Sequence, residues 1–207
     1  MIEFENVTKV LGNRAVLDAI SFRIEKGETF VIVGSSGMGK SVTLKHMVRL
    51  MRPDEGTVRV GDQVISEASG TRLEEIRDRF GYLFQGGALL AWLTVTENVA
   101  LPLREKTRMP NEAILEKVHK TLQLVGLDQD GEKRPSEISG GMQKRAGLAR
   151  AIIRDPAIVL YDEPTSGLDP VTSRTIAALI DNMRKQLGVT SVVVTHDLPR
   201  ALSIGSR

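Results

Sequence analysis

The chain has 207 residues, and at about 150 residues per domain this length predicts one large domain or two closely joined ones. Apolar residues make up 41% and charged residues 26%, which excludes the disordered, collagenous and coiled-coil classes. The absence of cysteine excludes disulfides, thiolate metal sites and cysteine catalysis. Lys and Arg number 28 against 26 Asp and Glu, with the signs interspersed, so we expect no nucleic-acid partner.

The start of the chain and its longest apolar run bear on its location. The first residues carry neither the basic nor the apolar segment of a secretory signal. The longest apolar run, residues 88–93, is far shorter than the roughly 18 residues that would span a bilayer. We therefore expect the chain to be cytoplasmic unless a partner carries it to a membrane.

The strands expected along the chain are of two kinds. Apolar and polar residues alternate in the first kind, which predicts half-exposed antiparallel strands at residues 2–7, 20–24 and 57–60. The second kind is nearly all apolar or β-branched, as in a buried parallel sheet, and comprises residues 29–33, 157–161 and 190–195. Because helix signals follow these buried strands, the sequence predicts an α/β fold.

The middle of the chain, residues 86–155, is predicted to be helical. Pro110 can begin one helix and Ser139 can cap another. The apolar face of the first of these helices consists of Ile114, Leu115, Val118, Leu122 and Val125. We expect a single domain in which this helical subdomain is inserted into a nucleotide-binding core made of residues 1–85 and 156–207.

A phosphate-binding loop of the pattern G-x-x-x-x-G-K-S follows the strand at residues 29–33 and precedes a helical stretch at residues 40–51. Glycines let backbone amides point at phosphate oxygens, and the helix N-terminus adds positive charge. Lys40 is expected to reach the terminal phosphates as a catalytic residue, and Ser41 to ligate magnesium. The nucleotide-binding residues predicted here are Gly34, Ser35, Ser36, Gly37, Met38, Gly39, Lys40, Ser41 and Val42.

Two acidic residues end the strand at residues 157–161. Asp162 can hold the magnesium ion through water. Glu163, one position further, can face a water in line with the γ-phosphate and act as its base or orienting group. We therefore expect Asp162 to be a metal ligand and Glu163 to be catalytic.

With these motifs in this order, the chain resembles the ATPase subunits of ATP-binding-cassette (ABC) transporters over residues 2–203. Residues 138–143 resemble the signature sequence of that family, Gln85 its Q-loop, residues 166–169 its D-loop and residues 194–197 its switch histidine. The resemblance implies a P-loop core with a parallel sheet, an N-terminal antiparallel β subdomain and an inserted helical subdomain. It also implies hydrolysis of ATP with Mg²⁺.

Further site residues come with this resemblance. Gln85 is implied to contact nucleotide and magnesium, Asp169 to contact nucleotide, and His196 to be a catalytic contact of the γ-phosphate. Family members usually stack an aromatic ring on adenine where this chain has Leu11, so we expect apolar contact without stacking. The family usually continues well beyond the position of Arg207, and we expect the C-terminal end to be incomplete.

A second anion site is expected at Ser139, Gly140 and Gly141, which open a helix. One chain then has two phosphate-binding sites for one γ-phosphate. This suggests a head-to-tail homodimer in which each subunit completes the nucleotide site of the other. Other charged and polar positions are expected to be ordinary. His46 and His119 are interpreted as solvated or packed helix positions, and the solvated face of the helix after Ser139 is expected to comprise Lys144, Arg145, Arg150 and Arg154.

Residues 83–89, 97–105 and 136–142 resemble the Mla-type lipid-transport branch of the family. This branch implies transport of phospholipid or another hydrophobic substrate, membrane permease subunits as partners, a lipid-binding protein reached through them, and a peripheral place on the cytoplasmic face of the membrane. Amino-acid and lipoprotein transporters share most of these motifs and stay open as alternatives. Soluble ABC ATPases are disfavoured, since the sequence has one cassette and no room for a long coiled coil between Lys40 and Ser139.

The stretch after Gln85 contains the sole Trp of the chain, Trp92, within its longest apolar run. Two interpretations stay open for residues 86–93. They form a buried helix, or they form part of a groove for a cytoplasmic helix of the permease, in which Trp92 is an anchor.

Overall fold

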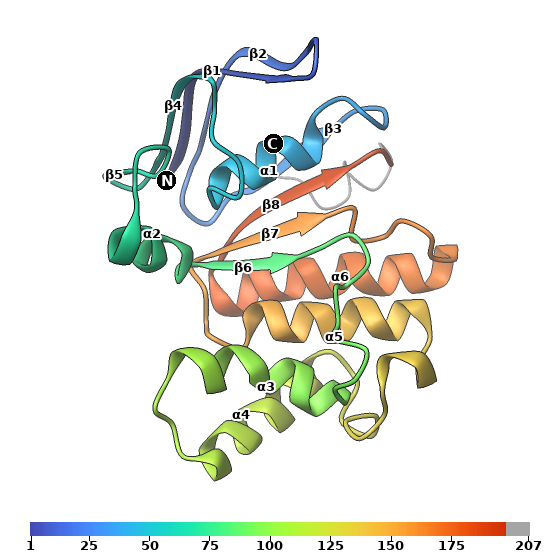
Figure 1. Ribbon diagram of the computed structural model, residues 1–207. Coiled ribbons are helices and arrows are strands. Elements are labelled where there is room, and N and C mark those ends of the chain that lie inside the picture. Colours follow the sequence, from blue (N-terminus) through green and yellow to red (C-terminus); the bar gives the residue numbers. More distant parts are fainter. Residues whose placement is uncertain (198–207) are drawn as a thin grey trace.

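An antiparallel sheet is formed by strands from the first third of the chain (Figure 1). In the computed structural model, which describes residues 1–197, the strand order is β2-β1-β4-β5. These strands are β1 (Ile2–Leu11), β2 (Arg14–Ile24), β4 (Glu55–Val60) and β5 (Gln63–Val64). The antiparallel strands predicted from alternation are confirmed, and β1 and β2 extend beyond their alternating segments.

A parallel sheet of order β3-β8-β7-β6 forms the centre of the molecule. Its strands are β3 (Thr29–Val33), β6 (Phe80–Leu83), β7 (Ile158–Asp162) and β8 (Thr190–Thr195). Strands β7 and β8 are buried along their whole length, as expected for a parallel sheet covered on both faces. The sequence did not predict β6, because Gly81 interrupts its apolar pattern. A Cβ atom on Gly81 would lie 2.1 Å from the carbonyl oxygen of Ala151, so glycine is needed for close helix packing here.

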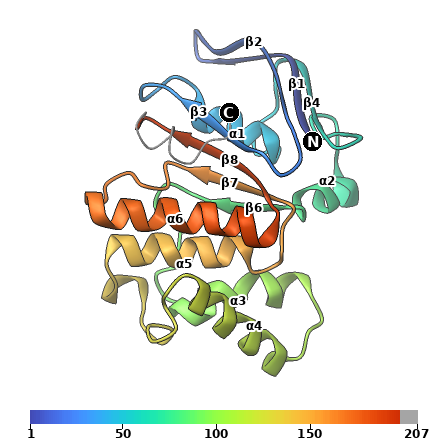
Figure 2. The same cartoon turned by 180° about the vertical axis from the view of Figure 1, so that it is seen from behind.

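Helix α1 (Lys40–Met47) lies between the sheets and contacts β4 on one side and β7 and β8 on the other (Figures 1 and 2). It ends before Met51, where the sequence predicted its end. Arg49 has a left-handed backbone with φ of 50°, which a helix cannot continue. The guanidinium of Arg77, at the end of α2 (Gly70–Arg77), donates to the Val48 and Arg49 carbonyl oxygens at 3.0 and 3.1 Å and stabilises this turn.

The other face of the parallel sheet is covered by helices (Figure 2). Helices α5 (Gly140–Ile152) and α6 (Pro170–Leu187) lie next to the sheet, and α3 (Val95–Lys106) and α4 (Asn111–Leu124) pack on α5. A 3₁₀ turn at Pro135–Glu137 precedes α5. Helix α5 contacts β6 and α6 as well as α3 and α4, so the helical segment shares its core with the sheet. The helix expected after Pro110 is confirmed, but Leu115 is 39% exposed, so its apolar face is narrower than predicted.

Successive side chains of β7 point to opposite faces of the sheet and so pack in two different cores. Ile158 and Leu160 pack in the core shared with α1 and the antiparallel sheet, whereas Val159 and Tyr161 pack against the helices on the other face. Within residues 1–197 no helix is both long and apolar enough to cross a bilayer. The end of the predicted core, residues 198–207, lies outside the described residues.

Candidate active site

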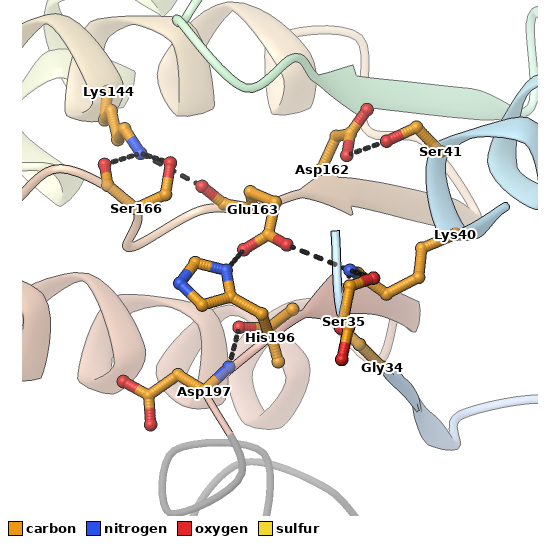
Figure 3. Close-up of polar contacts among 11 residues, drawn as sticks. Gly34, Ser35, Lys40, Ser41, Lys144, Asp162, Glu163, Ser166, His196 and Asp197 are labelled. Carbon is orange, nitrogen blue, oxygen red and sulfur yellow. Dashed lines mark hydrogen bonds and ion pairs between the residues drawn. The ribbon is translucent and has the colours of Figure 1, made fainter. Parts of the chain in front are cut away.

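The carboxyl ends of the parallel strands meet at one edge of the sheet. Val33 pairs with Thr195 across β3 and β8, and Asp162 pairs with Val194 across β7 and β8. The loop after β3, Asp162 at the end of β7 with Glu163 after it, and His196 after β8 therefore lie close together (Figure 3). This edge is where open α/β sheets bind their ligands.

The phosphate-binding loop curls tightly between β3 and α1. Gly37 and Gly39 have φ of 80° and 81°, and a Cβ atom on Gly39 would lie 2.7 Å from the Val16 carbonyl oxygen. Gly39 has no side chain to cap α1, so the first N–H groups of the helix are left for an anion. The buried Lys40 folds back over the loop and donates to the Gly34 and Ser35 carbonyl oxygens at 2.7 and 3.0 Å.

Ser41 and Asp162 form a pair that fits a magnesium ion. The Ser41 hydroxyl donates to Asp162 Oδ1 at 2.8 Å, and the Tyr82 hydroxyl lies 3.5 Å from Asp162 Oδ2. Burial, followed by the negative charge of Asp162, raises the pKa of Tyr82, which keeps its hydroxyl a neutral donor. Within residues 1–197 no group of three or more acidic or histidine ligands could hold a metal by itself. A hydroxyl and a carboxylate completed by phosphate oxygens and water are the usual ligands of Mg²⁺ beside nucleotides.

Glu163 occupies the centre of the site (Figure 3). Its Oε1 lies 3.5 Å from Lys40 Nζ and its Oε2 lies 2.8 Å from His196 Nδ1. Its backbone φ is 49°, in the left-handed region that residues other than glycine seldom adopt. The Glu163 N–H donates to the Val194 carbonyl oxygen at 3.0 Å, which ties this strained residue to β8.

A cavity of about 330 Å³ opens beside these residues. It is lined by Leu11, Val16, Ser36, Gly37, Gly39, Lys40, Ser41, Val42, Gln85 and Glu163. The structure therefore brings Leu11 of the first hairpin and Gln85 after β6 to the same cavity as the phosphate loop, and their contact with a nucleotide stays a prediction. Within residues 1–197, the lining of this cavity does not include Gly34, Ser35 or Met38. The carbonyl oxygens of Gly34 and Ser35 accept hydrogen bonds from Lys40, which does line it, and Met38 is 60% exposed.

The family of the chain follows from its similarity to known proteins. The family profile described as ABC transporter matches residues 17–166. The chain belongs to the ABC transporter family. The probable ribonucleotide transport ATP-binding protein mkl of Mycobacterium leprae is 44% identical over 203 residues, which cover 98% of this chain and 58% of that protein. The intermembrane phospholipid transport system ATP-binding protein MlaF of Escherichia coli K12 is 40% identical over 204 residues, which cover 99% of this chain and 76% of that protein. The chain spans less than two thirds of the mkl proteins, 58% in M. leprae and 56% in Mycobacterium bovis.

Solved structures of ABC proteins share the fold. The dimeric ATP-binding cassette MJ0796 in a post-hydrolysis state with ADP and Pi has a TM-score of 0.90 at 35% identity, covering 99% of this chain and 91% of that chain. The cbiO1 protein of Clostridium perfringens, part of the ABC transporter complex cbiONQ, has a TM-score of 0.88 at 26% identity, covering 99% and 81%. The predicted ABC ATPase fold is confirmed.

The residues that resemble the ABC signature and the D-loop lie elsewhere on the chain. Ser139 caps α5, accepting from the Met142 N–H at 3.3 Å, and Asp169 caps α6, accepting from the Val171 and Thr172 N–H groups at 2.9 and 3.0 Å. Hydrogen bonds from Thr172 lower the pKa of Asp169. A Cβ atom on Gly141 would lie 2.4 Å from Thr172 Cγ2, so these helix starts pack tightly. Among the described residues, those lining the phosphate-loop cavity do not include Ser139, Gly140, Gly141 or Asp169.

The expectation that the basic residues of α5, together with Arg154 just after its end, form a solvated face is wrong. Lys144 is 6% exposed, and burial lowers its pKa. The others also reach carbonyl or carboxylate oxygens of neighbouring segments: Arg145 those of Val125 and Gly126, Arg150 those of Gly87 and Ala88, and Arg154 that of Asp78. A sequence signal for Lys144 existed, because it stands at helical spacing with the buried Gly141, Leu148 and Ile152.

The stretch after Gln85 is irregular, so the interpretation of residues 86–93 as a buried helix is wrong. Asn98 of α3, fully buried, fixes this stretch. Its Oδ1 accepts from the Leu90 N–H at 2.7 Å, and its Nδ2 donates to the carbonyl oxygens of Leu90, Leu93 and Thr94. Trp92 is 70% exposed on the outside of this stretch.

A groove of about 490 Å³ lies beside that stretch, between β6, α3 and α5. It is lined by Phe80, Gly81, Tyr82, Phe84, Ala88, Leu101, Pro102, Glu105, Lys106, Arg150, Ala151 and Arg154. Within the described part of the chain Trp92 is not among these residues, so it does not anchor this groove. His46 and His119 are ordinary helix positions, His46 buried in α1 and His119 exposed on α4.

Proposed function

We propose that the chain is the ATP-binding and ATP-hydrolysing subunit of a membrane transporter. The observation that carries this proposal is the position of Glu163, whose carboxylate lies 3.5 Å from Lys40 Nζ and 2.8 Å from His196 Nδ1 beside the phosphate-loop cavity. A carboxylate in that place can accept a proton from the water that attacks a γ-phosphate. In this proposal residues 1–85 and 156–207 form the nucleotide-binding core, and residues 86–155 form the helical subdomain.

The phosphates are bound by the loop amides and by Lys40, which exchanges its carbonyl partners for phosphate oxygens. Leu11 gives the adenine an apolar contact. Ser41 and Asp162, assisted by Gln85, would hold Mg²⁺, which neutralises phosphate charge when bound. His196 Nδ1 donates to the Glu163 carboxylate at 2.8 Å, and a ring that carries a proton on Nε2 as well would also donate to the γ-phosphate. The strained backbone of Glu163 keeps its side chain aimed at this point.

Glu163→Gln tests the role of this carboxylate. The amide cannot accept a proton, so we expect ATP hydrolysis to fall by a factor on the order of 10² or more, while ATP affinity changes little. Phosphate release and nucleotide binding would be measured side by side. The exposed Glu132→Gln serves as a matched control and should retain its turnover. A Glu163→Gln protein that keeps most of its activity would remove this residue from the catalytic role.

The active unit in this proposal is a head-to-tail homodimer. Ser139, Gly140 and Gly141 are grouped with the D-loop at the starts of α5 and α6 and do not line the cavity of their own chain, as far as residues 1–197 show. A second copy would bring them to the γ-phosphate held by the first. The dimeric state of MJ0796, which this chain resembles, supports the arrangement.

The partners proposed for this dimer are membrane permease subunits, which place it peripherally on the cytoplasmic face of the membrane. The groove between β6, α3 and α5 is suited to an amphipathic cytoplasmic helix of the permease, because its lining combines apolar side chains with Glu105, Lys106, Arg150 and Arg154. We propose phospholipid or another hydrophobic molecule as substrate, supported by the similarity to MlaF of a phospholipid transport system, with a lipid-binding protein as a further partner.

Ribonucleotide transport is a second candidate, supported by the name of the mycobacterial relatives. The two are separated by reconstituting the chain with its permease in vesicles. Transfer of labelled phospholipid coupled to ATP hydrolysis supports the first candidate, and uptake of labelled ribonucleotide supports the second. If neither phospholipid nor ribonucleotide is transported, amino-acid and lipoprotein transport are the candidates that remain.

A further inference from the structure

Lys144 makes an uncommon contact with the segment that follows β7 (Figure 3). Its ammonium donates to the Glu163 carbonyl oxygen at 3.0 Å, to the Ser166 carbonyl oxygen at 2.7 Å and to Ser166 Oγ at 3.5 Å. The Glu163 carbonyl oxygen also accepts from the Ser166 N–H at 3.2 Å, which closes a turn. One buried cation of α5 thus holds both ends of the turn that begins at Glu163.

Burial of this charge is costly, since lysine is almost never fully buried unless it is paired. The partners of Lys144 are carbonyl and hydroxyl oxygens, and an apolar side chain would fill the same space without desolvating an ammonium group. The contact is therefore best explained by what it holds in place. The residue it holds is Glu163, whose φ of 49° requires support from its surroundings.

We propose that Lys144 is a positioning residue for Glu163: it ties the Glu163 peptide to the signature helix α5 and so keeps the carboxylate between Lys40 and His196. This inference rests on the proposed function. Ser139, which begins the same helix, grips the nucleotide of the other subunit in the proposed dimer. Lys144 therefore makes the orientation of one subunit's Glu163 depend on the position of the helix that contacts the other subunit's nucleotide.

Lys144→Met tests the contact, because methionine keeps most of the stem and removes the ammonium. We expect kcat for ATP hydrolysis to fall about tenfold, with KM for ATP changed less than about twofold, since the nucleotide-binding residues are untouched. Arg145→Met is the matched control on the same helix. Arg145 donates to the Val125 and Gly126 carbonyl oxygens at 2.8 and 2.7 Å, away from the site, so its loss should lower Tm and spare kcat.

A double-mutant cycle separates positioning from general support of the fold. In single-turnover measurements, Lys144→Met should have little further effect in the Glu163→Gln background, because no carboxylate is left to position. Lys144→Arg, which keeps donors near the turn, should recover part of the lost kcat. If Lys144→Met does not fold, Lys144→Leu, which also lacks a donor, takes its place in the cycle.

Wild-type kcat in a folded Lys144→Met or Lys144→Leu protein would overturn the inference. So would a loss of the same size in both backgrounds, or no recovery by arginine. The proposed function fails in a different way, through a wild-type protein that hydrolyses no ATP or a Glu163→Gln variant that keeps its turnover.

Discussion

At the scale of single residues, the site depends on a buried pair of opposite charges. Lys40 and Glu163 are each 8% exposed, and their charged atoms lie 3.5 Å apart. Removing one partner of such a pair leaves a buried charge without compensation, which is more harmful than replacing both. Lys40 also has the Gly34 and Ser35 carbonyl oxygens as acceptors, and Glu163 has His196. Each charge thus keeps a partner when the other turns to a phosphate or a water.

His46 gives a residue-scale prediction for the pH dependence of stability. Burial lowers the pKa of His46 below its usual 6.5, and the charge of Lys9 acts in the same direction. Nδ1 donates to the Val42 carbonyl oxygen, and Nε2 is buried without a partner among the described residues, so the folded state favours the neutral ring. The unfolded chain binds the proton more readily, so stability is fully present above the unfolded pKa and declines as pH falls below it towards the folded pKa.

We therefore expect the urea midpoint of the wild type to decrease between about pH 7.5 and pH 5.5. His46→Leu should remove the part of this decrease that comes from the ring. His119→Leu, an exposed position on α4, should leave it unchanged. Equal pH dependence in the wild type and in His46→Leu would contradict the assignment.

At the scale of elements, the groove is shaped by the start of α3. Thr94 and Glu97 form a capping box, in which Thr94 Oγ1 accepts from the Glu97 N–H at 3.1 Å and the Glu97 carboxylate accepts from the Thr94 N–H at 2.8 Å. Together with Asn98, the box fixes where the irregular stretch after Gln85 ends and α3 begins. The groove is consequently bounded by packed elements, since Leu101 and Pro102 of α3 line it together with residues of β6 and α5.

Leu101→Glu and Trp92→Ala test whether the groove is the docking surface for the proposed permease. A carboxylate in the apolar wall should abolish co-purification with the permease and coupled transport, while nucleotide binding and basal ATPase activity remain. Trp92→Ala removes a ring that is 70% exposed outside the groove and should preserve both association and transport. Loss of association in Trp92→Ala with retention in Leu101→Glu would move the docking surface from the groove to the Trp92 surface.

At the scale of the whole molecule, the two phosphate-binding sites that the sequence predicts belong to different parts of the chain. The phosphate loop lies at the edge of the parallel sheet, next to the antiparallel sheet, whereas Ser139 lies at the start of α5 on the helical side. Within residues 1–197 the structure does not bring them to one cavity. A single chain therefore offers a nucleotide the predicted contacts of the phosphate loop but not those of Ser139.

Light scattering of the Glu163→Gln protein with ATP is expected to show a doubled mass, because nucleotide binding without turnover should hold the dimer together. Ser139→Arg should abolish the doubling, since a long cation at the start of α5 occupies the space for the partner's phosphate. Ser69→Arg, an exposed position before α2, is the control and should still dimerise. Doubling that persists in Ser139→Arg would show that the signature is not at the interface.

The sequence alone determined the features that are contiguous in the chain. The strand, loop and helix around Lys40, the Asp162-Glu163 pair at the end of a buried strand, and the alternation of β1 and β2 each carry their signal within about ten residues. Local patterns of this length report which face of an element is buried and which backbone turns are allowed. They were sufficient for the fold class, the family resemblance and the candidate catalytic residues.

The tertiary structure decided the features that join distant segments. The position of Glu163 between Lys40 and His196, the hold of Lys144 on its carbonyl oxygen, and the separation of Trp92 from the groove are contacts between different elements. Helical periodicity could indicate the burial of Lys144, but it could not show that oxygens of other segments lie within reach of Arg145, Arg150 and Arg154. Such contacts depend on how strands and helices are placed against one another, and this placement is fixed by packing over the whole core.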